Sequence, residues 1–222
     1  GMEQALSCIP DIVVSDVMMP IMNGITMCKM LKEDVRTSHI PIILLTAKDS
    51  LQDKEEGYQV GADSYLTKPF SATLLHSRIN NLLESRKRLA ERLNTNTPHH
   101  NMDEKRALLA DSLNKLDNEF LEKINRLIED RLSSEKIDIG YLADNMCMSK
   151  STLYRKMKAL TGLSTNEYVR KIKMQYAERL LLEGRYNVSE IAFRVGINSV
   201  VYFRQCFKEE FGVLPSDYLK QP

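Results

Sequence analysis

The sequence lacks several features that would indicate a membrane, metal-binding or disulfide-bonded protein. No stretch approaches the roughly 18 consecutive apolar residues of a membrane span, and the N-terminus has no basic and apolar signal pattern. Cys8, Cys28, Cys147 and Cys206 form no C-x-x-C pair, so we expect reduced thiols rather than a zinc site or a disulfide framework. We therefore expect a cytoplasmic protein, with no membrane contact from this segment.

Signs of an enzyme are also scarce. The four histidines lie near no Ser or Cys in an arrangement suited to nucleophilic catalysis, and there is no pocket-forming Gly-rich loop. We therefore expect no catalytic residues in this chain. A composition of 43% hydrophobic and 27% charged residues is that of an ordinary globular protein, and 222 residues are enough for two domains.

The overall net charge of +1 conceals an asymmetry between the two halves. From residue 131 onward there are 15 Lys and Arg against 10 Asp and Glu, whereas residues 1–130 hold 16 against 20. A polyanion is the natural partner of the basic second half.

The first part of the chain alternates short strands with helices. Strands are expected at 12–17, at 40–46 and up to residue 66, with helices at 25–32 and 49–60 between them and a long helix from residue 71. This alternation predicts a parallel sheet.

Three residues with functional side chains follow these strands at fixed intervals. Asp16, Thr46 and Lys68 are separated by 30 and then 22 residues, and the segments Met18-Met19-Pro20 and Asn23-Gly24 come soon after the aspartate. This pattern resembles the receiver domain of two-component response regulators. The resemblance implies a flavodoxin-like (CheY-like) α/β fold.

The resemblance also assigns roles to single residues. Asp16 would be the phosphoacceptor that takes a phosphoryl group from a histidine kinase. Thr46 and Lys68 would bind the phosphoryl oxygens, Tyr65 would be the inward-turning switch aromatic, and the Lys68-Pro69 bond would be cis.

Only 15 residues precede Asp16, fewer than the roughly 30 of a βαβ unit. We therefore expect an N-terminally truncated, partial receiver over residues 2–93. A complete receiver would bind Mg²⁺ through an acidic pair at the end of its first strand, and no such strand precedes Asp16. We expect no metal and no cofactor in this fragment, and no phosphorylation of it.

A receiver without its first two strands would leave the Asp16 strand at the edge of the sheet. We expect that edge, or the helix over residues 75–93, to form a homodimer. Leu75, Ile79, Leu82, Leu89 and Leu93 keep a coiled-coil spacing along this helix. A charged helix that frays into the linker is the alternative.

A polar stretch separates the first domain from a helical one. Residues 94–101 include Pro98 and lack apolar periodicity, so we place a linker over residues 94–118 and an all-α domain over residues 119–222.

Two segments of the helical domain repeat one pattern. Residues 139–158 and residues 190–208 each contain a small alanine, Ala143 or Ala192, followed four residues later by a turn. Ser149 in the first segment and Asn198-Ser199 in the second can cap the helix that follows. These segments predict two helix-turn-helix units.

This arrangement resembles the DNA-binding domain of the AraC/XylS family. The features that carry the resemblance are the two units, the helix 169–183 between them and a set of residues in and around the second unit: Arg179-Leu180-Leu181, Tyr202-Phe203, Phe207-Lys208, Phe211-Gly212 and Pro215. It implies double-stranded DNA as the partner, read by two helices in successive major grooves about 34 Å apart.

Candidate DNA contacts lie on the second helix of each unit. In the first unit we expect Lys150, Ser151 and Arg155 to face bases, and Thr152 and Lys156 to lie nearer the phosphate backbone. Leu153 and Met157 should point inward. For the second unit the family pattern places Val200, Val201 and Gln205 on the groove side, with Phe203 and Phe207 as core. The chain departs from the commoner pattern at two positions: Gln205 stands where the family often has Arg or Lys, and Arg204 stands where a small polar residue is usual. Gln and Val would favour an A/T-rich element.

The best interpretation is a sequence-specific DNA-binding transcription regulator of a two-component phosphorelay. The alternative is that the receiver part serves only as a dimerisation or interaction module and that DNA binding is independent of phosphate. Two parent proteins fit, a free-standing response regulator and a hybrid sensor with a histidine kinase upstream, so the kinase would act in trans or in cis.

Overall fold

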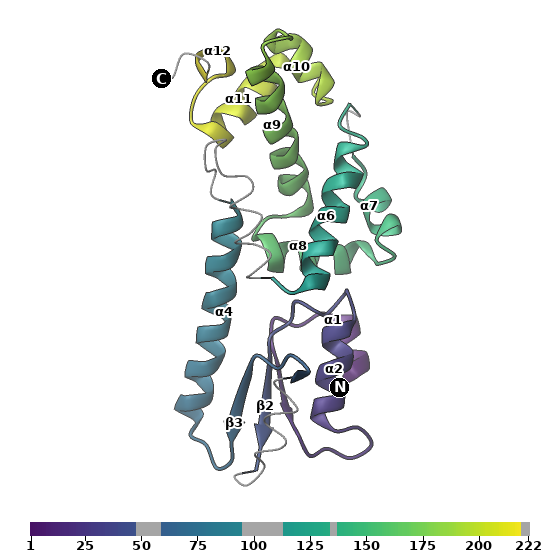
Figure 1. Cartoon of the computed structure of the whole chain (residues 1–222), viewed down its shortest axis with the longest axis vertical. Coiled ribbons are helices and arrows are strands. Elements are labelled where there is room, and N and C mark those ends of the chain that lie inside the picture. The colour runs from purple at the N-terminus through teal and green to yellow at the C-terminus, as the bar shows by residue number, and fades with distance from the viewer. Residues whose placement is uncertain (48–58, 95–112, 134–136, 219–222) are drawn as a thin grey trace. The chain divides into compact units, whose positions relative to one another are not determined.

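The computed structural model describes residues 1–47, 59–94, 113–133 and 137–218 (Figure 1). The chain divides into two compact units. The first comprises residues 1–94, 103–120 and 155–162, and the second residues 95–102, 121–154 and 163–222. Most of the predicted helix 49–60 and most of the predicted linker 94–118 lie outside the described residues. No helix in the described ranges is long and apolar enough to cross a membrane.

A three-stranded parallel sheet lies in the first unit. Its strands are β1 (Val13–Asp16), β2 (Ile42–Thr46) and β3 (Ser64–Thr67), in the order β1-β2-β3. The predicted parallel sheet is thus confirmed. Asp16 lies opposite Leu45, and Thr46 lies opposite Thr67. All three strands therefore end on one side of the sheet.

The strands differ in burial as their composition predicts. The central strand β2 reads as a continuous apolar run, and its first three residues are fully buried. In β1 the alternation is weaker, and Val14 is 39% exposed. Among the described residues β1 pairs with β2 alone, so the Asp16 strand is an edge strand, as predicted.

Helices α1 (Met2–Cys8), α2 (Gly24–Glu33) and α4 (Ala72–Asn94) complete the described part of this α/β region. The Asn23 side chain begins α2 by accepting a hydrogen bond from the Thr26 N–H at 2.7 Å. The apolar face of α2 packs against β2 in one cluster, with Ile25, Met27, Cys28 and Leu31 against Ile42 and Leu44. This packing holds α2 beside the strand ends.

The long helix α4 presents a half-buried apolar stripe that includes Leu75, Ile79, Leu82 and Leu89. Arg86 on this helix pairs with Asp63 at 3.7 Å. The stripe has the predicted spacing, while its pairing with another chain stays a prediction.

Seven helices are described in the second half of the chain. They are α6 (Lys115–Glu129), α7 (Ile139–Asn145), α8 (Lys150–Thr161), α9 (Thr165–Glu183), α10 (Val188–Arg194), α11 (Val200–Phe211) and α12 (Pro215–Tyr218). The two predicted helix-turn-helix units are the pairs α7–α8 and α10–α11. Helix α6 begins at Lys115, so the helical structure starts within the predicted linker.

The turns of the two units have the same hydrogen-bond pattern. The Met148 N–H donates to the Ala143 carbonyl at 3.0 Å, and the Ile197 N–H donates to the Ala192 carbonyl at 2.9 Å. Each turn has one residue in the left-handed region, Cys147 with φ 54° in the first and Gly196 with φ 65° in the second. Only the second turn places a glycine where that conformation is free of Cβ strain.

Helix ends explain why α9 and α10 form where they do. Ser164 and Glu167 form a capping box at the start of α9, and Asn187 and Glu190 form another at the start of α10. Gly184, in the left-handed conformation, ends α9.

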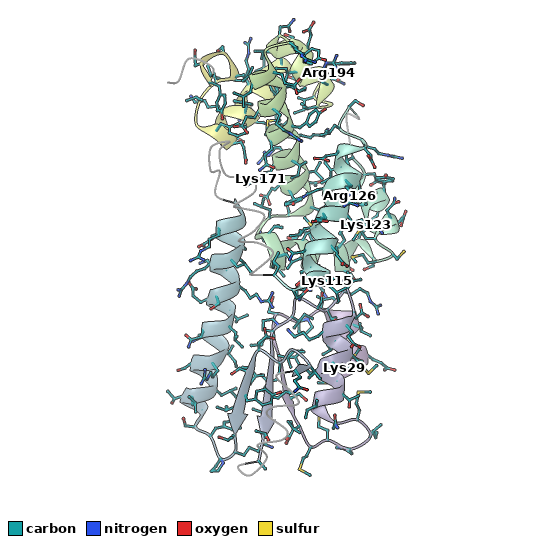
Figure 2. All side chains as sticks on the ribbon, viewed as in Figure 1. Lys29, Lys115, Lys123, Arg126, Lys171 and Arg194 are labelled. Carbon is teal, nitrogen blue, oxygen red and sulfur yellow. The ribbon has the colours of Figure 1, made fainter. Side chains whose placement is uncertain are left out.

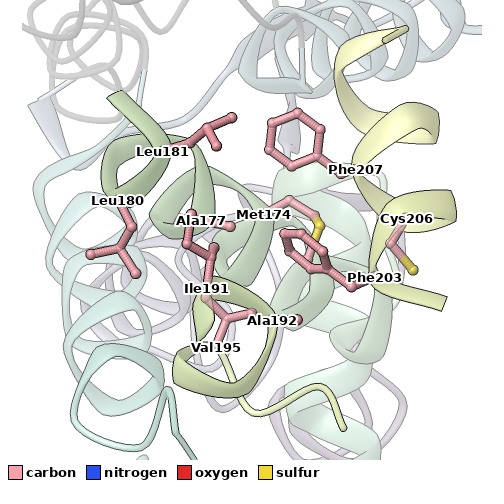
Figure 3. Close-up of a cluster of buried hydrophobic side chains, with 10 residues drawn as sticks. All are labelled: Met174, Ala177, Leu180, Leu181, Ile191, Ala192, Val195, Phe203, Cys206 and Phe207. Atoms are coloured by element: carbon pink, nitrogen blue, oxygen red, sulfur yellow. The ribbon is translucent and has the colours of Figure 1, made fainter. Parts of the chain in front are cut away.

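An apolar cluster joins α9, α10 and α11 (Figure 3). Its buried members are Met174, Ala177, Leu180, Leu181, Ile191, Ala192, Val195, Phe203, Cys206 and Phe207. The predicted core positions Phe203 and Phe207 are confirmed. Further aromatics extend the cluster. The Phe207 and Phe211 rings are tilted against each other, with centroids 4.5 Å apart, and Phe207 meets the Tyr218 ring edge-on at 5.5 Å.

Candidate functional site

Asp16 and Lys68 meet at the carboxyl end of the sheet. The Lys68 ammonium donates to the Asp16 carboxylate, and the Met18 N–H donates to the same carboxyl group at 3.3 Å. The Lys68 hydrogen bond is the main cause that lowers the pKa of Asp16 below its ordinary value. The structure therefore holds an ionised carboxylate at a strand end, beside a cation.

Thr46 and Tyr65 lie on the two neighbouring strands. Thr46 is buried at the end of β2, and its carbonyl accepts a hydrogen bond from the Lys68 N–H at 2.8 Å. Tyr65 is half-buried and packs against the apolar cluster under the sheet, which agrees with its predicted inward orientation. The Lys68-Pro69 bond is cis, as predicted.

Gly24 has a role that the sequence pattern did not reveal. The first residue of α2 lies so close to β1 that a Cβ atom on it would stand 2.2 Å from the Asp16 carbonyl oxygen. The Gly24 N–H also donates to the Val17 carbonyl at 2.9 Å. Gly24 thus allows α2 to start directly against the strand end that carries Asp16.

A Mg²⁺ site needs several oxygen ligands, usually including one or two carboxylates and a substrate phosphate. Within residues 1–47, 59–94, 113–133 and 137–218, no group of three acidic, His or Cys side chains could hold a metal ion. In this structure the Asp16 carboxylate is paired with the Lys68 ammonium.

Helix α8 carries the first set of predicted DNA contacts. Lys150, Ser151 and Arg155 are exposed, and Leu153 and Met157 are buried as predicted. The Arg155 guanidinium donates a hydrogen bond to the Cys8 carbonyl. Thr152 is half-buried, and its N–H donates to the Ser149 hydroxyl at 3.1 Å. Ser149 therefore caps this helix, as its position predicts.

The prediction for Lys156 is wrong. Its side chain is fully buried, and its ammonium lies 2.5 Å from the Asp117 carboxylate of α6, which is also fully buried. The Ser38 hydroxyl, in the same compact unit, bonds to both groups. Burial lowers the pKa of Lys156, while Asp117 opposes that shift. Because its charge is already paired inside the protein, Lys156 cannot serve as a phosphate contact in this structure.

Helix α11 carries the second set. Val201 is 78% exposed, and Arg204 and Gln205 are also exposed, with the Gln205 amide donating to the Glu209 carboxylate at 3.1 Å. Val200 departs from its predicted place on the groove side, because it is half-buried and packs against the apolar cluster of α9 and α10. A side chain this near the helix start can reach the core beneath it.

Helix α9 carries two buried lysines, Lys171 and Lys173. Lys173 donates to the Gly196 carbonyl, in the turn of the second unit, at 3.4 Å. Lys171, labelled in Figure 2, lies 3.6 Å from the Glu210 carboxylate.

Comparisons with known proteins agree with both parts of the site. The response regulator receiver domain family matches residues 2–80, and a helix-turn-helix domain family matches residues 142–221. Histidine kinase P4 of Formosa agariphila is 37% identical over 210 residues, which are 95% of this chain and 15% of that protein. RpaA of Synechocystis sp., a DNA-binding dual master transcriptional regulator, is 40% identical over 91 residues, which are 41% of this chain and 38% of that protein.

Among solved structures, the C-terminal domain of AraT, a response regulator from Geobacillus stearothermophilus, is 30% identical. The match covers 46% of this chain and 84% of that one, with a TM-score of 0.42. The chain thus spans much less than two thirds of the two curated relatives described above. The chain therefore combines a response regulator receiver domain in its first part with an AraC-type helix-turn-helix domain in its second.

Proposed function

We propose that this chain reads DNA as the output end of a two-component regulator of transcription. The observation that carries the proposal is the pair of helix-turn-helix units, each with exposed polar or basic side chains on its second helix: Lys150, Ser151 and Arg155 on α8, and Arg204 and Gln205 on α11. Such helices fit the major groove, where side chains meet base edges and phosphates.

The proposed contacts differ between the two helices. On α8, Lys150 and Arg155 suit guanine or phosphate, while Ser151 suits several bases. On α11, Gln205 suits adenine and Val201 suits a thymine methyl group, so this half would favour an A/T-rich element. Thr152 lies nearer the DNA backbone, and Arg204 adds positive charge.

For the receiver part we propose that Asp16 is the phosphoacceptor of the whole protein, with Thr46, Tyr65 and Lys68 as its switch residues. The relative from Formosa agariphila is named a histidine kinase, and this chain is similar to a small part of it. That similarity supports a parent in which the kinase and this output end share one chain. A regulator that binds chromosomal DNA would act in the cytoplasm.

A second candidate function concerns the receiver part alone. Among the described residues no group of three acidic, His or Cys side chains gathers at Asp16, and β1 is an edge strand. These observations favour a receiver part that serves as an interaction module, for which a second copy of the chain is the simplest partner.

Selection of bound fragments from a genomic library, at a stated salt concentration, tests the DNA function. We expect enrichment of a site with two elements about one helical turn apart. Failure to enrich any sequence over random DNA would overturn the proposal.

Intact mass after incubation with a small phosphodonor and Mg²⁺ separates the two roles of the receiver part. We expect no gain of a phosphate by this chain. A gain that the Asp16→Asn variant does not show would instead support a phosphate switch within these residues.

A further inference from the structure

A buried ion pair joins the first turn of α6 to the middle of α8. The Lys156 ammonium and the Asp117 carboxylate lie 2.5 Å apart, and both side chains are fully inaccessible to solvent. The Lys156 ammonium also lies 4.9 Å from the centre of the Phe120 ring, one helical turn further along α6. The Lys156 ammonium is therefore enclosed by the Asp117 carboxylate and the Phe120 ring.

The energetics of such a pair favour a role other than stability. Removing two opposite charges from water costs several kcal/mol per ion, and apolar residues of similar size often serve as well or better. Two neighbours of the pair along the helices, Phe120 on α6 and Leu153 on α8, are apolar and buried. An ion pair adds a geometric restraint to such a core, because a short charge-assisted hydrogen bond is satisfied in few relative positions of its two side chains.

The pair lies on the inner side of the same helix that presents the proposed DNA contacts. Around α8, Leu153, Met157 and Leu160 are buried on the side of Lys156, while Ser151, Arg155 and Lys158 are exposed. Successive residues of an α-helix are about 100° apart, so an anchor at Lys156 sets the rotation of α8 about its axis. That rotation decides where Ser151 and Arg155 point.

We propose that the Asp117–Lys156 pair is the positioning element of the first reading helix, and that it contributes to DNA specificity rather than to net stability. The proposal rests on the proposed DNA-binding function. Asp117 and Lys156 do not touch DNA in it. They act by fixing the orientation of the exposed side chains of α8.

The test compares the full chain with the double variant Asp117→Leu/Lys156→Met, which replaces the pair by apolar groups. Lys158→Met is the matched control, because it removes the same charge from an exposed position of the same helix. Three quantities are measured: the midpoint of thermal unfolding, the ratio of affinities for the selected site and for random DNA, and base-by-base interference in each half of the site.

We expect the double variant to unfold no earlier than the wild type, but to show a specificity ratio lower by about tenfold, the loss of roughly one base contact. Interference should weaken only in the half read by α8. The Lys158→Met control should bind both kinds of DNA less well and keep the ratio. A double variant with the wild-type ratio and interference pattern would overturn the proposal.

Lys156→Arg keeps the test decisive if the double variant does not fold. Arginine keeps the charge but is too large for the closed site, so α8 must turn to admit it, and the ratio should fall in the same half. An unchanged ratio in this variant would also overturn the proposal. A wild-type chain that selects no DNA sequence at all would instead overturn the proposed function on which this inference rests.

Discussion

The two reading helices of this protein are held in place by different kinds of contact. Helix α8 adds a buried ion pair, Asp117–Lys156, to its buried apolar side chains Leu153, Met157 and Leu160. Helix α11 is held through an apolar cluster in which Phe203 and Phe207 are fully buried against α9 and α10 (Figure 3). The same motif, with equivalent turns, therefore has a polar anchor in one copy and an aromatic anchor in the other.

The difference shows which property each anchor can supply. An aromatic cluster contributes stability in proportion to the area it removes from water, and it tolerates small shifts of its members. An ion pair contributes little net stability but tolerates few geometries. We therefore expect mutations around α11 to lower mainly the free energy of unfolding. Mutations around α8 should lower mainly the specificity for DNA.

The largest expected effect is on the aromatic anchor. Phe207→Ala removes a fully buried ring and should lower the free energy of unfolding by about 3–5 kcal/mol. Phe193→Ala is the matched control, because that ring is 71% exposed and its removal should cost less than about 0.5 kcal/mol. Urea denaturation measures both, and equal losses would contradict the comparison.

The next effect is on DNA reading by α8. Arg155→Ala should weaken binding to the selected site by about 1–3 kcal/mol and relax the preference at one base pair. Titrations against the selected site and against random DNA measure this. Lys158→Ala, on the same helix, controls for loss of charge alone. Equal losses of affinity on both DNAs would assign Arg155 to phosphate contact.

Acid should lower the stability of the unit that contains His39 and the Asp117–Lys156 pair. Burial, and then the positive charge of Lys156, lower the pKa of His39 to about 3. The unfolded chain binds a proton below about pH 6.5, whereas the folded chain does not until about pH 3. The free energy of unfolding should therefore fall as the pH drops below about 6.5, by up to about 1.4 kcal/mol per pH unit.

Urea denaturation between pH 7 and 4.5, on the wild type and on His39→Leu, measures this dependence. The variant should show a flatter profile, because it has lost the group that titrates. A variant profile as steep as that of the wild type would assign the acid sensitivity to other residues.

The smallest expected effect concerns the two turns. Cys147→Gly should raise the free energy of unfolding by up to about 1 kcal/mol, because Cys147 has a positive φ that glycine adopts without strain. Gly196→Ala, at the equivalent position of the second unit, should lower it. Thermal unfolding of both variants gives the signs, and a stabilising Gly196→Ala would contradict the equivalence of the turns.

Local signals were enough to predict most elements. Apolar runs gave the strands, and Ser149 and Ser199 marked the starts of α8 and α11, because strand burial and helix capping depend on nearby residues. The intervals between Asp16, Thr46 and Lys68 gave the site at the sheet end. Its closeness to Gly24 was not predictable, since it depends on how α2 packs.

Lys156 shows where the reasoning from sequence failed. It lies three residues after Leu153 and four before Leu160, so the helical pattern placed it on the buried side, but its charge led to an exposed assignment. Asp117 likewise stands three residues before Phe120, on the buried side of α6. Two opposite charges at inward positions of two helices are a signal for a buried pair, although one sequence does not say which helices will meet.

Gly24 has a consequence for how such chains can vary. A single added carbon at this position would stand 2.2 Å from the Asp16 carbonyl oxygen, so any other residue would force α2 or the strand end to move. A chain that keeps the acid, the threonine and the lysine but loses this glycine would keep the signature of the site and lose its shape. In newly sequenced genomes, the residue at this position therefore reports whether an apparent phosphoacceptor still has the backbone that presents it.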